Sequence, residues 1–122
     1  MPHDIQLEQI HEVIHHQAKG ISYVLTDRLW PRGIRKDDLD HITWYKEAGP
    51  TPDLRKAFHD GSLNTEKFHQ AYKKQLLATP ESLEPLLSTA KKGKLCLLTA
   101  THDAANSYLT VLRDVLLAEL NT

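Results

Sequence analysis

The chain has 122 residues, of which 40% are hydrophobic, so it supports one ordinary core and we expect a single domain over residues 1–122. Basic and acidic residues nearly balance, at 15 and 16, and the net charge of -1 lacks the positive excess typical of non-specific nucleic-acid binding. No export signal and no run of about 18 apolar residues is present, which argues against secretion and membrane spanning, and we expect a cytoplasmic protein. The one cysteine, Cys96, excludes a disulfide framework.

The first third of the chain predicts two strands and two helices. Alternating Ile5 and Leu7 indicate a short strand, and helical spacing of apolar residues then predicts a short helix over residues 10–14. The run "ISYVLT" (residues 21–26) has the β-branched and apolar character of a buried strand. A helix is predicted to begin at Asp37 or Asp38, with its apolar stripe formed by Leu39, Ile42 and Tyr45 or Lys46.

The rest of the chain predicts three more helices, then one strand and a final helix. Thr51 and Asn64 are expected to cap two helices, the first with Pro52 in its first turn and the second with Phe68, Ala71, Tyr72 and Leu76 facing the core. A further helix should run from Thr79 or Ser82 to Ala90 and stop at Gly93, before the strand "KLCLLTA". The last helix should be capped by Thr101 or Asp103, with an apolar stripe of Ala105, Tyr108, Leu109, Leu112 and Leu116.

Two unbroken apolar strands separated by helices predict an α/β fold. We expect a short, mainly parallel sheet covered by helices on both faces, because a sheet face open to water would show alternating polar residues. Ligands of such folds bind beyond the carboxyl ends of the strands. The segments "DRLWPRG" and "TATHD" both follow predicted strands, so we expect them to meet and to form the functional site.

The segment "DRLWPRG" supplies the candidate catalytic residues Asp27, Arg28 and Arg32. Arginine presents a planar fork of donors that suits carboxylate or phosphate, and Asp27 could orient that fork or accept a proton. Trp30 and Gly33 are candidate ligand-binding residues in the same turn, where Gly33 is free to adopt positive φ. The structural alternative is that Asp27 pairs with Arg28 or Arg32 to attach the loop to a helix, with Trp30 in the core.

Further candidate ligand-binding residues are expected around the same edge of the sheet. Lys46 and Arg55 would add positive charge, and the start of the last helix would offer amides and the side chains of Thr99, Thr101, Asp103 and Asn106. His102 is a candidate acid or base, whereas simple capping is the alternative for Asp103. No P-loop, GxGxxG or GxSxG motif is present, and the sequence identifies no cofactor.

Eight histidines raise the alternative of a metal protein. His11 and His15 are four residues apart on a predicted helix, which suits zinc, and His16 is adjacent. No cysteine or carboxylate completes the set at a recognisable spacing, so surface histidines are the preferred interpretation and no metal ligand is assigned.

The motifs "DRLWPRGI", "WYKE", "LRKAF", "AYKKQL" and "LLTATHDAAN", in this order, resemble the bacterial YeaO-like family, domain of unknown function 488. The resemblance covers most of residues 21–117, and it implies a small α/β domain rather than a particular activity. At "KAFHDGS" the chain departs from the family pattern, so no role is carried over to His59. The resemblance points to Asp27, Arg28, Trp30, Pro31, Arg32, Gly33, Lys46, Arg55, Asp103 and Asn106.

Two classes of function follow from the sequence. The first is an enzyme or ligand-binding domain whose strand-end pocket holds an anionic small molecule, either a nucleotide or a phosphorylated metabolite. The second is a regulator or interaction module that binds protein or nucleic acid, although the near-neutral charge disfavours DNA. The sequence does not determine the oligomeric state, and a homo-oligomer is compatible with it.

Overall fold

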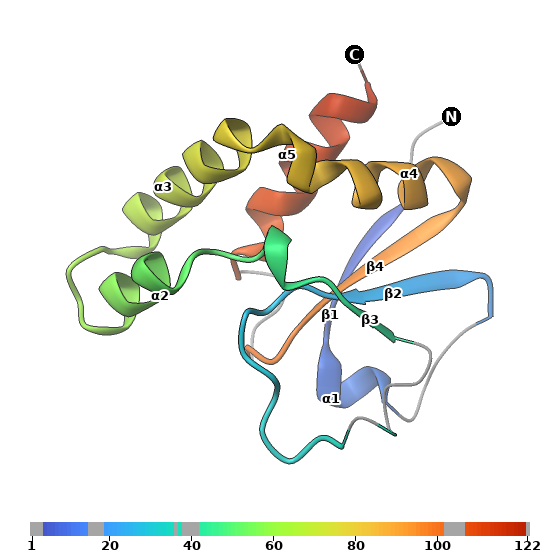
Figure 1. The fold of residues 1–122 in the computed structure, drawn as a ribbon, viewed down its shortest axis with the longest axis horizontal. Helices are drawn as coiled ribbons and strands as arrows, with labels where there is room; N and C mark the ends of the chain where they lie inside the picture. The colour runs from blue at the N-terminus through green and yellow to red at the C-terminus, as the bar shows by residue number, and fades with distance from the viewer. Residues whose placement is uncertain (1–3, 15–18, 36, 38–41, 102–106, 122) are drawn as a thin grey trace.

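The fold is built on a parallel sheet of four strands, seen in a computed structural model that describes residues 4–14, 19–35, 37, 42–101 and 107–121. The strands lie in the order β1-β4-β2-β3 (Figure 1). Their register places Tyr23 beside both Cys96 and Ile42. An α/β fold with a parallel sheet is therefore confirmed. The strands are β1 (Ile5–Gln9), β2 (Ile21–Leu25), β3 (Ile42–Trp44) and β4 (Lys94–Thr99).

Helices cover both faces of the sheet, but unequally. On one face, Val24, Leu95 and Leu97 pack against apolar side chains from the long helices α3 (Thr65–Ala78), α4 (Glu84–Lys92) and α5 (Leu109–Leu120). On the other face, the core is closed by the single-turn helix α1 (Ile10–Val13) and by the loop after β2. The side chains of this second core are Ile10, Val13, Tyr23, Leu25, Ile34, Ile42, Cys96 and Leu98.

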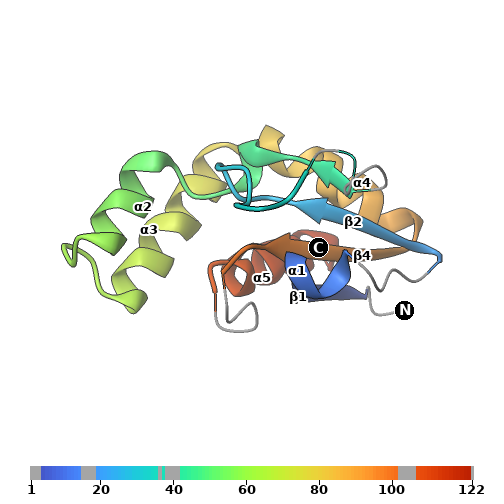
Figure 2. The same ribbon diagram turned by 90° about the horizontal axis from the view of Figure 1, so that it is seen from below.

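Helices α2 (Pro52–His59) and α3 form a hairpin that extends beyond the end of the sheet, as Figures 1 and 2 show from two directions. Both predicted caps are confirmed, because Thr51 Oγ1 accepts a hydrogen bond from Leu54 N and Asn64 Oδ1 accepts one from Lys67 N. The apolar stripe of α3 buries Phe68, as predicted. The hairpin therefore has its own local start signals and lies beside the carboxyl ends of the strands.

The helix predicted to begin at Asp37 or Asp38 is wrong from Ile42 onward. Residues 42–44 form β3, which pairs in parallel with the outer edge of β2, and Lys46–Ala48 form a separate 3-10 turn, η2. The pairing continues past the strand, where Tyr45 N donates to Leu25 O at 2.8 Å. The β-branched and aromatic side chains of this segment suit an extended backbone, and an available strand edge outweighs weak helical spacing. Asp38 and Leu39 lie outside the described residues.

Two helix starts also differ from the prediction. The segment after α3 begins with a 3-10 turn, η3 (Pro80–Leu83), and α4 starts only at Glu84, still with Pro85 in its first turn and ending before Gly93. The final helix begins at Leu109 rather than near Thr101, so Thr101 does not cap it. Its first turn bonds locally, since Leu109 N donates to Ser107 Oγ. Asp103 and Ala105 lie outside the described residues.

Candidate functional site

The carboxylate of Asp27 joins the ends of the two central strands. Asp27 follows β2 and is 95% buried, and its oxygens accept hydrogen bonds from Thr99 Oγ1 and Ala100 N, both at 2.8 Å, and from the Tyr108 hydroxyl. The prediction that the segments after the two apolar strands meet in space is therefore confirmed for Asp27, Thr99 and Ala100, whereas His102 and Asp103 lie outside the described residues. Within the described part of the chain, no ion pair to Asp27 accompanies these three bonds. Its partners are neutral donors rather than an arginine.

Tyr108 is buried against this carboxylate. Its hydroxyl lies 2.8 Å from Thr26 Oγ1, and its ring packs edge-on against Tyr72 with the ring centroids 5.4 Å apart. Burial, followed by the negative charge of Asp27, raises the pKa of Tyr108 well above its ordinary value. The phenol therefore stays protonated and serves as a donor to Asp27. An enclosed carboxylate with three donors is suited to hold this segment in place.

Arg28 is directed toward the turn before α2. Its Nε and Nη2 donate to Gly49 O at 3.3 and 3.2 Å, and Gln75 Nε2 donates to the same carbonyl oxygen at 2.9 Å. Gly49 is required here because a Cβ atom would lie 2.2 Å from Thr26 O. The guanidinium of Arg28 thus ties the end of β2 to the segment that leads into the helical hairpin.

Two indoles give the loop after β2 its shape. Trp30 Nε1 donates to Ile34 O and Trp44 Nε1 donates to Asp27 O, both at 2.7 Å, and the two rings meet edge-on with centroids 5.0 Å apart. Gly33 adopts a φ of +77°, as its position in the turn requires. The side chains of Arg32, in this loop, and Lys46, after β3, are both exposed. Lys46 Nζ lies 5.4 Å from the centre of the Trp44 ring.

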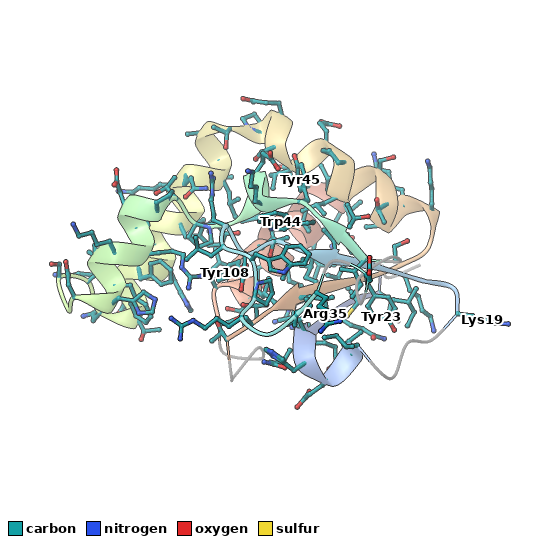
Figure 3. The ribbon with its side chains drawn as sticks, turned by 60° about the horizontal axis from the view of Figure 1, so that its bottom comes forward. Lys19, Tyr23, Arg35, Trp44, Tyr45 and Tyr108 are labelled. Carbon is teal, nitrogen blue, oxygen red and sulfur yellow. The ribbon has the colours of Figure 1, made fainter. Side chains whose placement is uncertain are left out.

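A groove of about 250 Å³ lies between the α2–α3 hairpin and the residues Thr101, Ser107 and Tyr108. We call it the Arg55 groove; Tyr108, on its inner wall, is labelled in Figure 3. Of the predicted site residues, Arg55 and Thr101 line it, while the buried Thr99 lies behind Thr101 and donates to Asp27. Asp103, Asn106 and His102 lie outside the described residues. The described lining comprises Arg55, Phe58, His59, Thr65, Phe68, His69, Thr101, Ser107 and Tyr108.

The lining of the Arg55 groove is rich in donors and contains no carboxylate among its described residues. Arg55 is half-buried, and its guanidinium has no protein partner within the described part of the chain. Two imidazoles and the hydroxyls of Thr65 and Thr101 share the same groove. A guanidinium with no partner among the described residues, set among neutral donors, favours an anionic guest, because arginine recognises carboxylate and phosphate with its fork of N–H groups.

Comparison with known proteins identifies the family. A profile of DUF488-N3i, described as the inactive DUF488-N3 subclade, matches residues 4–122. The chain belongs to the DUF488 family. The uncharacterised protein YeaO of Escherichia coli is 39% identical over 91 residues, which cover 75% of this chain and 79% of that protein. The YeaO-like resemblance seen in the sequence is thereby confirmed.

Two mycobacterial relatives extend this comparison. Uncharacterised proteins of Mycobacterium tuberculosis and Mycobacterium bovis are each 33% identical over 93 residues, covering 76% of this chain and 78% of theirs. No solved structure matches this DUF488 chain. The family assignment therefore rests on sequence similarity.

Several groove residues of this DUF488 protein were not among the predicted site residues. The signal that points to them is a repeated Phe-His pair, at residues 58–59 and 68–69, on either side of the turn at Gly61. The Phe58 and Phe68 rings stack with centroids 4.5 Å apart and planes at 13°, which places His59 and His69 at the same groove. Burial lowers the pKa of His69 below its ordinary value.

The described residues of the DUF488 fold show no group of three or more histidine, cysteine, aspartate or glutamate side chains that could hold a metal ion. His15 and His16, which belong to the metal alternative, lie outside these residues. In the same part of the chain, no helix has both the length and the apolar character needed to cross a membrane.

Proposed function

We propose that this DUF488 protein is a non-catalytic module that binds a small anionic molecule, a nucleotide or a phosphorylated metabolite, in the Arg55 groove. The observation that carries the proposal is the half-buried guanidinium of Arg55, which faces a groove without a described carboxylate and has no partner among the described residues. A cytoplasmic location, which a single free cysteine favours, is part of this proposal.

Binding without catalysis is supported by the state of the best candidate catalytic group. The carboxylate of Asp27 is enclosed and accepts three hydrogen bonds, so it is occupied in holding Tyr108 and the end of β4. The family profile that matches the chain is also described as an inactive subclade. Direct ligand contacts by Arg28, Arg32 and Lys46 stay predictions, since these side chains lie outside the described lining of the groove.

The test compares ligand-induced thermal stabilisation in matched variants. Inorganic phosphate and adenosine monophosphate serve as probes, and a ligand at about ten times its Kd should stabilise the native state by about 1.4 kcal/mol. Arg55→Gln should abolish the rise in melting temperature while leaving the unliganded protein as stable as the wild type. Lys56→Gln is the control, because Lys56 is exposed on the same helix and lies outside the described groove lining.

Two outcomes would argue against the proposal. If neither probe stabilises the wild-type protein at millimolar concentration, or if Arg55→Gln keeps the full shift, the groove is not the anion site. Salt-sensitive retardation of a nucleic-acid probe, unaffected by Arg55→Gln, would favour the regulator alternative instead.

A further inference from the structure

We infer that the Arg55 groove binds the dianionic terminal phosphate of a small phosphomonoester together with one proton, which is carried by His59 or His69. This inference rests on the proposed function and specifies both the ligand class and the regulation of the same site. Tight binding at acid pH and weaker binding at alkaline pH follow from it.

The charge of the groove favours an extra proton when a dianion binds. Arg55 supplies the one permanent positive charge among the described lining residues, whereas a phosphomonoester carries about two negative charges near neutral pH. The remaining polar lining consists of hydroxyls and the two imidazoles. Protonating one imidazole brings the groove to two positive charges and matches the guest, because an anion in contact with histidine favours its charged form.

His69 lies between two grooves of the molecule. It lines the Arg55 groove on one side and, on the other, a separate groove between α3 and α5. Burial lowers the pKa of His69 in the unliganded protein. The titratable and charged groups that share these grooves with His69 are Arg55, His59, Glu66, Lys73, Asp114 and Glu119.

His59 is the second candidate for the proton. It is exposed and forms the last residue of α2. The neighbouring Asp60 accepts a hydrogen bond from Ser62 N, and Arg55 shares the groove. The two histidines therefore come from different helices of the hairpin. His59 is exposed and His69 is half-buried, and both line the same groove.

The shape of the groove favours a compact phosphorylated group over a stacked base. Phe58 and Phe68 stack on each other, so the faces they turn toward one another are occupied. The volume of about 250 Å³ lies below the roughly 300–1,000 Å³ of sites that enclose drug-sized ligands. Phosphate bound to the donors, with a small carbon skeleton against the phenyl edges, fits this space.

Sulfate is the decisive probe because it remains a dianion from about pH 6 to about pH 8, whereas phosphate itself titrates in this range. Calorimetric titration of the full chain at constant ionic strength should show the sulfate affinity falling roughly threefold to tenfold between these two pH values. The sign follows from linkage, because sulfate binding raises the pKa of the imidazole. The bound proton therefore contributes to sulfate affinity below the pKa of the unliganded protein. This contribution is lost as the pH rises through the pKa of the liganded protein.

Histidine ring NMR identifies the proton carrier. Sulfate should raise the titration midpoint of His59 or His69, with signals assigned from the variants His59→Gln and His69→Gln. His11→Gln is the control, since His11 lies on α1 and lines a different surface pocket. The double variant of His59 and His69 should keep weak binding through Arg55 and lose the pH dependence.

These experiments test the proton coupling separately from the anion binding itself. Sulfate binding that is equally tight at about pH 6 and about pH 8, or a pH dependence that survives in the double variant, overturns the proton coupling and leaves anion binding intact. A wild-type chain that binds neither sulfate nor phosphate at either pH overturns the proposed function as well.

Discussion

The hydroxyl of Tyr108 donates a hydrogen bond to the buried carboxylate of Asp27, so the residue that precedes α5 is anchored to the residue two positions after β2. The same hydroxyl also lies beside Thr26 Oγ1. This contact brings the inner wall of the Arg55 groove against the strand ends, and its contribution to stability can be measured directly.

Tyr108→Phe should lower the free energy of unfolding by about 1–3 kcal/mol, because it removes one donor from a buried carboxylate. Asp27→Ala should cost more, since it leaves the hydroxyls of Thr99 and Tyr108 and the amide of Ala100 without their acceptor. Urea denaturation followed by far-UV circular dichroism measures both. A Tyr108→Phe protein within about 0.5 kcal/mol of the wild type would show that this bond does not stabilise the fold.

Arg28→Ala should be destabilising and Arg32→Ala nearly neutral. Arg28 donates two hydrogen bonds to Gly49 O, and we expect a loss of about 1–2 kcal/mol when they are removed. Arg32 is exposed, and a surface substitution of this kind changes stability by about 0.5 kcal/mol or less. Guanidinium denaturation of the two variants gives the comparison, and equal losses would contradict the assigned role of Arg28.

Gly49→Ala should reduce stability by about 3 kcal/mol or more, because the added Cβ atom would lie 2.2 Å from the backbone oxygen of Thr26. The matched control is Gly93→Ala, where nothing lies within 4 Å of the new atom. Thermal unfolding of both proteins measures the difference. If Gly49→Ala and Gly93→Ala have the same melting temperature, the close approach of Gly49 to the backbone of Thr26 is not present in solution.

Cys96 should resist alkylation in the folded protein. Burial, with smaller contributions from Glu8 and Asp4, raises the pKa of its thiol to about 12, so roughly one thiol in ten thousand is ionised at about pH 8. Iodoacetamide labelling followed by intact-mass spectrometry should show modification only after guanidinium is added. Rapid labelling of the native chain would mean that the second core opens readily.

The central strands could be predicted from sequence because their signal is local. The apolar runs around Val24 and Leu97 are unbroken, and each ends in polar residues where the strand ends. The caps at Thr51 and Asn64 were equally readable, since each side chain bonds an amide three residues away. In these segments the local preference and the final fold agree.

The segment around Ile42 could not be predicted in the same way. Its apolar spacing fits a helix, but its conformation is decided by the edge of β2, which is 19 residues earlier at the pairing of Tyr23 with Ile42. The start of α5 was misplaced for a related reason. Its first turn bonds to Ser107 rather than to a conventional cap near Thr101, and the sequence does not reveal that Tyr108 turns inward to Asp27.

The candidate site was predicted in part. Arg55 and Thr101 were expected near the strand ends and do line one groove, whereas Arg28 turns to Gly49. The Phe-His pairs were missed because their importance depends on the hairpin between α2 and α3, which stacks the phenyl rings across a turn. A repeated pair on both sides of a glycine is a pattern that sequence reading can use.

The strand order has a consequence for synthesis on the ribosome. β4 is the last strand to be made, yet it lies between β1 and β2 and provides the only sheet partner of β1 among the described strands. Until residues 94–99 have left the exit tunnel, β2 and β3 can pair with each other, but the first strand has no neighbour. The nascent chain must therefore keep residues 5–9 without their native sheet partner until residues 94–99 have been made, and only then can the sheet be completed.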